Sequence, residues 1–60
     1  MYKVRYKIKY TIDPYYEPKV QTEVIDEITT MQSGNYQLCN SGIPIRTLFH
    51  DELISLEVLA

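Results

Sequence analysis

The chain has 60 residues, of which 45% are hydrophobic and 23% charged, and its formal net charge is -2. A domain this small buries only about 60% of the surface that its unfolded chain exposes, so we expect one domain, residues 1–60, with a thin core. Because it holds one cysteine and one histidine, the chain lacks the residues for an internal disulfide or a four-ligand zinc site, and we expect no metal and no cofactor.

The single cysteine also bears on the cell compartment. An unpaired cysteine is typical of proteins of the reducing cytoplasm. No apolar run approaches the roughly 18 to 20 residues that cross a membrane, and the N-terminus alternates instead of forming the continuous apolar region of a signal peptide. We therefore expect a cytoplasmic protein without membrane contact.

Residues 1–13 predict a strand with two different faces. Tyrosine, valine and isoleucine occupy the even positions and basic residues the odd ones, which sets Tyr2, Val4, Tyr6, Ile8, Tyr10 and Ile12 against Lys3, Arg5, Lys7 and Lys9. Because strand side chains alternate with a period of two, the apolar face is predicted to be the main wall of the core. The basic face is predicted to lie in solvent.

A stiff loop is predicted at residues 13–18, where Pro14 and Pro18 cannot donate ladder hydrogen bonds. It carries the adjacent Tyr15 and Tyr16, which we expect to be partly exposed. Exposed aromatic pairs serve as binding elements, although packing of one ring over the core is the other interpretation.

Residues 19–32 fit two interpretations. At helical spacing they form an apolar stripe of Val20, Val24, Ile25, Ile28 and Met31. The many β-branched residues favour a strand instead, and a hairpin centred on Tyr16 would place Glu23 opposite Lys9 and Glu27 opposite Arg5. We predict the strand, with a β-bulge near Ile25, and expect the two glutamates to neutralise half of the basic face.

The rest of the chain is divided by turn residues at 32–35 and 40–42. Strands are predicted at 36–39 and 43–49, a single helical turn at 50–52 and a last strand at 53–59, for which an amphipathic helix is the alternative. These elements predict an all-β fold, a five-stranded SH3-like or Sm-like barrel or an antiparallel meander. The alternative is an α+β fold with a helix at about 19–32 packed on an antiparallel sheet.

The ending of the chain, residues 46–59, resembles the close of WYL domains. In that family a strand of Arg-Thr-Phe type leads through a short polar turn into a strand of the Ser-Val-Glu-Val-Leu kind, and here Arg46-Thr-Leu-Phe leads to Ser55-Leu-Glu-Val-Leu59. The Trp-Tyr-Leu signature itself is missing, and Asn35-Tyr-Gln-Leu38 is a degraded form of it. The resemblance implies a regulatory, ligand-sensing role and a binding role for Arg46.

Catalysis finds little support in the residues. A nucleophile and base would have to be Cys39 and His50, and a free cysteine is usually a small buried hydrophobe. Gly34 and Gly42 are isolated turn glycines, not parts of a phosphate-binding loop. We expect a protein that is not an enzyme.

Binding of a protein partner is the function that we expect. Exposed tyrosines and an edge strand suit aromatic docking or strand addition, with contacts from Tyr10, Tyr15 and Tyr16 besides Arg46. Small domains of this kind are frequent among phage and mobile-element products that regulate or inhibit a host machine. A homodimer formed by pairing of edge strands would also enlarge the core.

Binding of single-stranded nucleic acid is the alternative. Lys3, Arg5, Lys7 and Lys9 would contact phosphates, and nearby tyrosines would stack on bases. The first ten residues hold four basic groups and no acid, whereas the remaining fifty hold two basic residues and eight acids. The negative net charge of the chain counts against this function, because most domains that bind nucleic acid carry an excess of basic residues.

Overall fold

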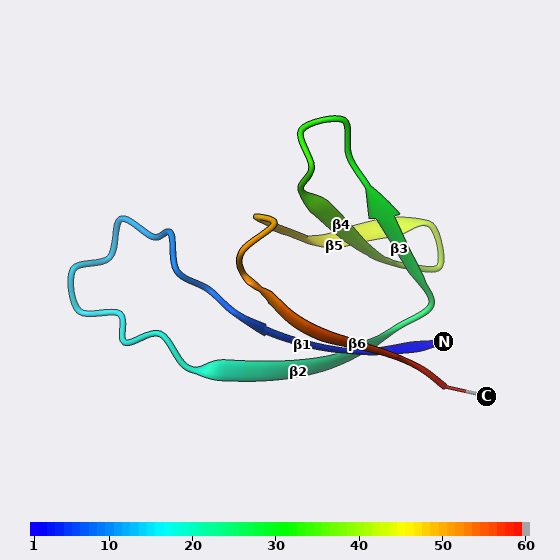
Figure 1. Ribbon diagram of the computed structural model, residues 1–60, viewed down its shortest axis with the longest axis horizontal. Coiled ribbons are helices and arrows are strands. Elements are labelled where there is room, and N and C mark those ends of the chain that lie inside the picture. Colours follow the sequence, from blue (N-terminus) through cyan, green and yellow to red (C-terminus); the bar gives the residue numbers. More distant parts are fainter. Residues whose placement is uncertain (60) are drawn as a thin grey trace.

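The computed structural model describes residues 1–59, in which six strands and no helix are present (Figure 1). The strands are β1 (Tyr2–Lys7), β2 (Val20–Ile25), β3 (Glu27–Thr30), β4 (Tyr36–Asn40), β5 (Ile43–Leu48) and β6 (Leu53–Val58). They form two antiparallel three-stranded sheets, with the strand orders β2-β1-β6 and β3-β4-β5. The all-β prediction is confirmed. The alternative prediction of a helix at 19–32 is wrong. The predicted helical turn at 50–52 is also wrong, because these residues form a turn without a helix.

The prediction of five strands is wrong because residues 20–30 make two strands that belong to different sheets. Asp26 separates them. Its backbone N–H donates to Asn40 Oδ1 at 2.9 Å, and its carboxylate accepts from the Ser41 N–H at 2.7 Å. Asp26 therefore marks the corner at which the chain passes from one sheet to the other, not a bulge within a single strand.

The observed register of β1 and β2 differs from the predicted hairpin. Val4 lies opposite Glu23, and Lys3 lies opposite Val24. The shift is an odd number of residues, so it moves Glu23 from the basic face of the sheet to the face of Val4 and Tyr6. Glu27 belongs to β3 and pairs with Cys39. The predicted neutralisation of the basic face by Glu23 and Glu27 is therefore wrong.

β1 ends at Lys7, not at Asp13, and it is the central strand of its sheet, with both edges paired. Tyr10 and Ile12 consequently lie outside the strand, on a long loop of residues 8–19. This loop extends well beyond the sheets at one end of the molecule (Figure 1).

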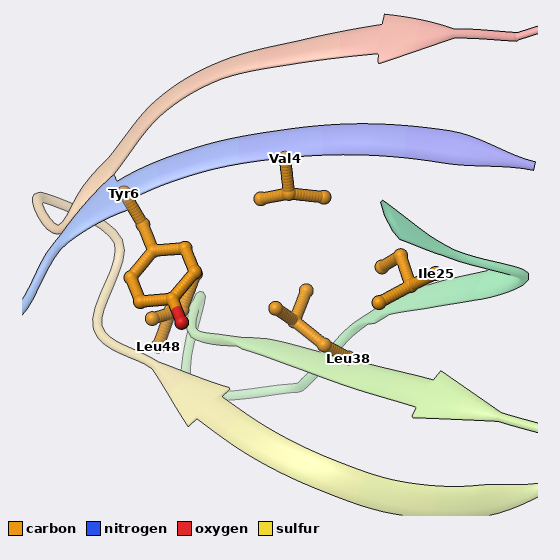
Figure 2. Packing of buried hydrophobic residues seen from close by; sticks show 5 residues of the cluster. All are labelled: Val4, Tyr6, Ile25, Leu38 and Leu48. Carbon is orange, nitrogen blue, oxygen red and sulfur yellow. The ribbon is translucent and has the colours of Figure 1, made fainter. Parts of the chain in front are cut away.

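The core lies between the two sheets. Side chains from both sheets face each other in Figure 2, and the fully buried apolar ones are Val4, Tyr6, Ile25, Leu38 and Leu48. Partly buried residues surround them, namely Tyr2, Ile8, Ile28, Tyr36 and Leu53. The prediction that the even-numbered residues of the first strand form a core wall is confirmed for positions 2 to 8. In the described range no helix is long and apolar enough to cross a membrane.

Candidate functional site

A buried carboxylate joins the turn before β6 to the start of the long loop. Glu52 is 2% exposed. Its Oε1 accepts a hydrogen bond from the Phe49 N–H at 2.7 Å, and its Oε2 accepts one from the Lys9 N–H at 2.8 Å. The Glu52 carbonyl also accepts from the Lys7 N–H at 2.9 Å. Glu52 thus holds the backbone at residues 7–9 against the turn at 49–52.

This connection places Tyr10 beside Phe49, two residues that we call the aromatic pair. Their ring centroids lie 4.9 Å apart at an interplanar angle of 74°, an edge-to-face contact. The two residues are 56% and 46% exposed. Both therefore keep a large part of their surface in solvent after the contact has formed.

Asp51 completes the aromatic pair. The Tyr10 hydroxyl donates a hydrogen bond to Asp51 Oδ2. This bond lowers the pKa of Asp51 and raises the pKa of Tyr10, because it favours the charged carboxylate and the neutral phenol. The second carboxylate oxygen, Oδ1, is buried and has no partner within residues 1–59.

The long loop presents two apolar side chains almost entirely to solvent. Ile12 is fully exposed and Tyr15 is 91% exposed. Asp13 shapes the loop between them, because its side chain accepts from the Tyr15 N–H at 2.9 Å and its carbonyl accepts from the Tyr16 N–H at 3.2 Å. Tyr16 is half-buried, and its hydroxyl accepts a hydrogen bond from Gln21 Nε2 at 3.4 Å.

A polar cluster of Tyr6, Glu23 and Arg46 connects the two sheets. The Tyr6 hydroxyl donates to Glu23 Oε1, and burial together with this hydrogen bond raises the pKa of Tyr6 to about 12. Arg46 Nε lies 3.4 Å from Glu23 Oε1, an ion pair without hydrogen-bond geometry. The Arg46 guanidinium carbon lies 5.2 Å from the Tyr6 ring centroid, within cation–π range. Arg46 therefore serves the packing of β5 on β1.

The basic row, which we define as Lys3, Arg5 and Lys7, lies on the outer face of β1. Its neighbours on β2 are Val24, Thr22 and Val20, and its neighbours on β6 include Ser55 and one acid, Glu57, opposite Lys3. Within residues 1–59 the only ion pair is that of Arg46 with Glu23. Lys9 lies beyond the strand and does not extend the row. The three side chains of the basic row thus make no ion pair with the residues that the structure describes.

Cys39 and His50, the two residues considered for catalysis, lie in different environments. Cys39 is 6% exposed, and its nearest polar partner is Gln37 Oε1 at 4.0 Å. His50 is exposed and uses its backbone N–H to bond Asn35 Oδ1 at 3.3 Å. No pocket and no group of three potential metal ligands occurs in the described part of the chain.

Sequence reasoning missed Glu52, Phe49 and Asp51 as parts of one site. A signal was present, since a lone phenylalanine precedes a polar turn that contains two adjacent acids. Nothing in the local pattern showed that this turn would contact residues 9 and 10, which are about forty positions away in the chain.

Comparison with known proteins gives no relative. No family model matches the chain. No curated protein and no solved structure matches it either.

Proposed function

We propose that this protein is a non-catalytic interaction module that binds a protein partner through the long loop and the aromatic pair. The observation that carries the proposal is the exposure of Ile12 and Tyr15, whose apolar side chains contribute almost nothing to the core. Together with the exposed halves of Tyr10 and Phe49, they supply aromatic and aliphatic anchors of the kind that dominate binding energy at protein interfaces.

The loop is held at both ends, which favours binding. Glu52 fixes its start at Lys9, and the hydrogen bond of Gln21 with Tyr16 holds its end against β2. Pro14 and Pro18 restrict the backbone between these points. A restricted loop loses less conformational entropy when it is bound, so more of the contact energy appears as affinity.

The experiment is affinity capture with quantitative mass spectrometry from a lysate of the source cell. The tagged wild-type protein is compared with a double variant, Ile12→Ala with Tyr15→Ala, and with a control, Val24→Ala with Thr29→Ala, which truncates exposed side chains on the sheets. We expect a protein that the wild type and the control enrich and that the loop variant loses. With the purified partner, the loop variant should bind at least about tenfold more weakly.

Two outcomes would contradict the proposal. One is the absence of any protein enriched over a tag-only control. The other is a partner that the loop variant retains with unchanged affinity. A role as a regulator or inhibitor of a host machine, as we expect for a phage or mobile-element product, depends on the identity of that partner.

Binding of single-stranded nucleic acid by the basic row is our second candidate, and the register of β1 and β2 favours it. Because Glu23 lies on the core face of the sheet, the outer face keeps Lys3, Arg5 and Lys7 without an ion pair to any of residues 1–59. Such a row can contact successive phosphates. It ranks second because no tyrosine lies beside it on that face and the net charge is acidic.

A mobility-shift assay with a labelled oligonucleotide tests this candidate. We expect retardation at low salt that Arg5→Glu with Lys7→Glu abolishes and that Lys19→Glu, a charge reversal on the exposed loop, leaves intact. No shift at any salt concentration, or equal loss with the Lys19 variant, would remove the basic row as a site.

We also infer that the two sheets belong to a small barrel of the SH3-like or Sm-like kind. β2 and β3 are separated by Asp26 alone, and a bend of this kind is how strands pass from one sheet to the other at the corners of small barrels. The turn at 49–52 joins the sheets at a second corner. The barrel that we infer is open, because within residues 1–59 no pairing joins the edges of β5 and β6.

A further inference from the structure

Four strands of the described chain have one unpaired edge, namely β2 and β6 in the first sheet and β3 and β5 in the second. Unpaired edges can pair with another chain, and proteins discourage this with prolines, inward-pointing charges, β-bulges or short strands. β5 contains Pro44, β2 carries the inward-facing Glu23, and β3 has four residues. β6 contains no proline, and its single charge, Glu57, lies on the outer face opposite Lys3. Its one irregularity, a bulge at Ile54, lies near the start of the strand and leaves residues 55–58 in regular register with β1.

β6 also carries apolar side chains that the second sheet does not cover. Leu56 lies opposite the buried Val4, and Val58 lies opposite Tyr2, so both continue the core face of β1 to the edge of the sheet. They are nevertheless 44% and 73% exposed, and Ile54, at the register shift, is 49% exposed. These three residues occupy every second position of β6, and we call them the apolar row.

The backbone N–H and C=O groups of Leu56 and Val58 face away from β1. The Leu59 N–H donates to the Met1 carbonyl at 2.8 Å, which marks positions 1 and 59 as a hydrogen-bonded pair. Hydrogen-bonded and non-hydrogen-bonded pairs alternate along an antiparallel ladder. Position 57 therefore bonds to β1, whereas the N–H and C=O groups of Leu56 and Val58 point to the free edge.

We propose that β6 pairs antiparallel with β6 of a second copy of this chain, about a two-fold axis at Leu56. The β2-β1-β6 sheets of the two copies then form one continuous sheet of six strands. In this register Leu56 lies opposite the same residue of the second copy, and Ile54 lies opposite Val58. Ser55 lies opposite Glu57, which keeps the two glutamates apart.

The register follows from the direction of the backbone groups. A two-fold axis that passes between residues would set an outward-pointing residue against an inward-pointing one, so no ladder could form. An axis at Ile54 or Val58 keeps the ladder but leaves part of the apolar row unpaired. A two-fold contact also requires a surface that is complementary to itself. The apolar row meets this requirement, because Ile54 and Val58 lie two residues on either side of Leu56. Self-complementarity is why the occupant is a second copy of the chain.

Sedimentation velocity over concentrations from about 1 µM to about 1 mM tests the dimer. We expect the mass to rise from that of one chain to that of two. Val58→Lys places a charge at the edge, at a site that is 73% exposed, and should weaken dimerisation at least about tenfold. Ile43→Lys is the matched control on the edge of β5, at a site that is 65% exposed, and should dimerise like the wild type. Circular dichroism checks that both variants are folded.

A wild-type protein that stays monomeric at about 1 mM would overturn the proposal. It would also fail if Ile43→Lys dissociated the dimer and Val58→Lys left it intact. The interaction proposed for the long loop does not use β6, so either proposal can fail while the other stands.

Disulfide trapping tests the register in a Cys39→Ala background. Cα atoms directly opposite in a sheet lie about 5.5 Å apart, within reach of a disulfide. Leu56→Cys should form a covalent dimer under mild oxidation, whereas Ile54→Cys alone should form at least about tenfold less. A mixture of Ile54→Cys and Val58→Cys chains should cross-link to each other. Cross-linking of Ile54→Cys to itself in preference to Val58→Cys would overturn the register.

Discussion

The connection made by Glu52 can be tested by one isosteric substitution. In Glu52→Gln the side chain keeps its shape, but one of its two terminal atoms becomes a donor. Both carboxylate oxygens accept backbone hydrogen bonds, from Phe49 at 2.7 Å and from Lys9 at 2.8 Å. Whichever way the amide is turned, one backbone N–H then faces an N–H of the glutamine.

The expected cost follows from the loss of one charge-assisted hydrogen bond and from one backbone donor left unpaired beside a buried side chain. The first contributes about 1.5 to 3 kcal/mol and the second costs about 1 to 3 kcal/mol, with overlap between them, so we expect a loss of roughly 2 to 4 kcal/mol. A domain of this size has a total unfolding free energy of only about 3 to 5 kcal/mol. The variant should therefore be close to its unfolding midpoint in water.

Urea denaturation followed by circular dichroism measures this loss. The matched control is Glu17→Gln, which removes the same charge from an exposed loop position and should change the free energy of unfolding by less than about 0.5 kcal/mol. The wild type and the two variants are compared at one low protein concentration, so that self-association does not contribute to the measured free energy of unfolding. If Glu52→Gln unfolds at the same urea concentration as Glu17→Gln, Glu52 does not hold the loop to the turn.

Two further predictions concern Tyr6 and the turn at 40–43. The pKa of Tyr6 is raised from 10.0 to about 12, so folding favours the neutral phenol. The stability that Tyr6 contributes should be complete below pH 10 and fall by roughly 2 to 3 kcal/mol as the pH rises to about 12. In urea titrations at several pH values Tyr6→Phe should remove this part of the alkaline fall and leave the part that Tyr10 causes, and an unchanged fall would show that Tyr6 does not contribute. Ser41 and Gly42 have φ values of 53° and 75°, the signature of a type I′ turn, in which asparagine is favoured at the first position. Ser41→Asn should raise the free energy of unfolding by about 0.5 kcal/mol and Ser41→Val should lower it, and thermal unfolding with the opposite order would refute this reasoning.

Local patterns predicted the elements with a strong period or clear turn residues. The alternation of Val4 and Tyr6 with basic neighbours predicted a strand and its buried face, and both are confirmed. The turn residues at 40–42 predicted the short connection between β4 and β5. Beyond Lys7 the same alternation continues to Ile12, yet no strand forms there because no neighbouring strand pairs with those residues.

The candidate site was predicted only in part. Tyr15 is exposed and Tyr16 is half-buried, within the expectation for this pair, whereas Tyr10 lies outside the predicted core wall and Arg46 packs against Tyr6. Their roles in binding stay predictions. The partners of Tyr10, which are Phe49 and Asp51, come from the other end of the chain and carry no pattern that links them to it.

The sequence by itself determined the all-β class and the two-faced first strand, because alternation and turn chemistry depend on residues within a few positions of one another. Only the tertiary structure decided which face Glu23 occupies, where the chain changes sheets and what Glu52 holds together. These depend on register, and a shift by an odd number of residues moves a side chain from solvent to core while the local pattern stays the same. The basic row shows the difference most plainly, since the sequence predicted its charges, whereas the register moved Glu23 to the other face and left the row without ion pairs in the described part of the chain.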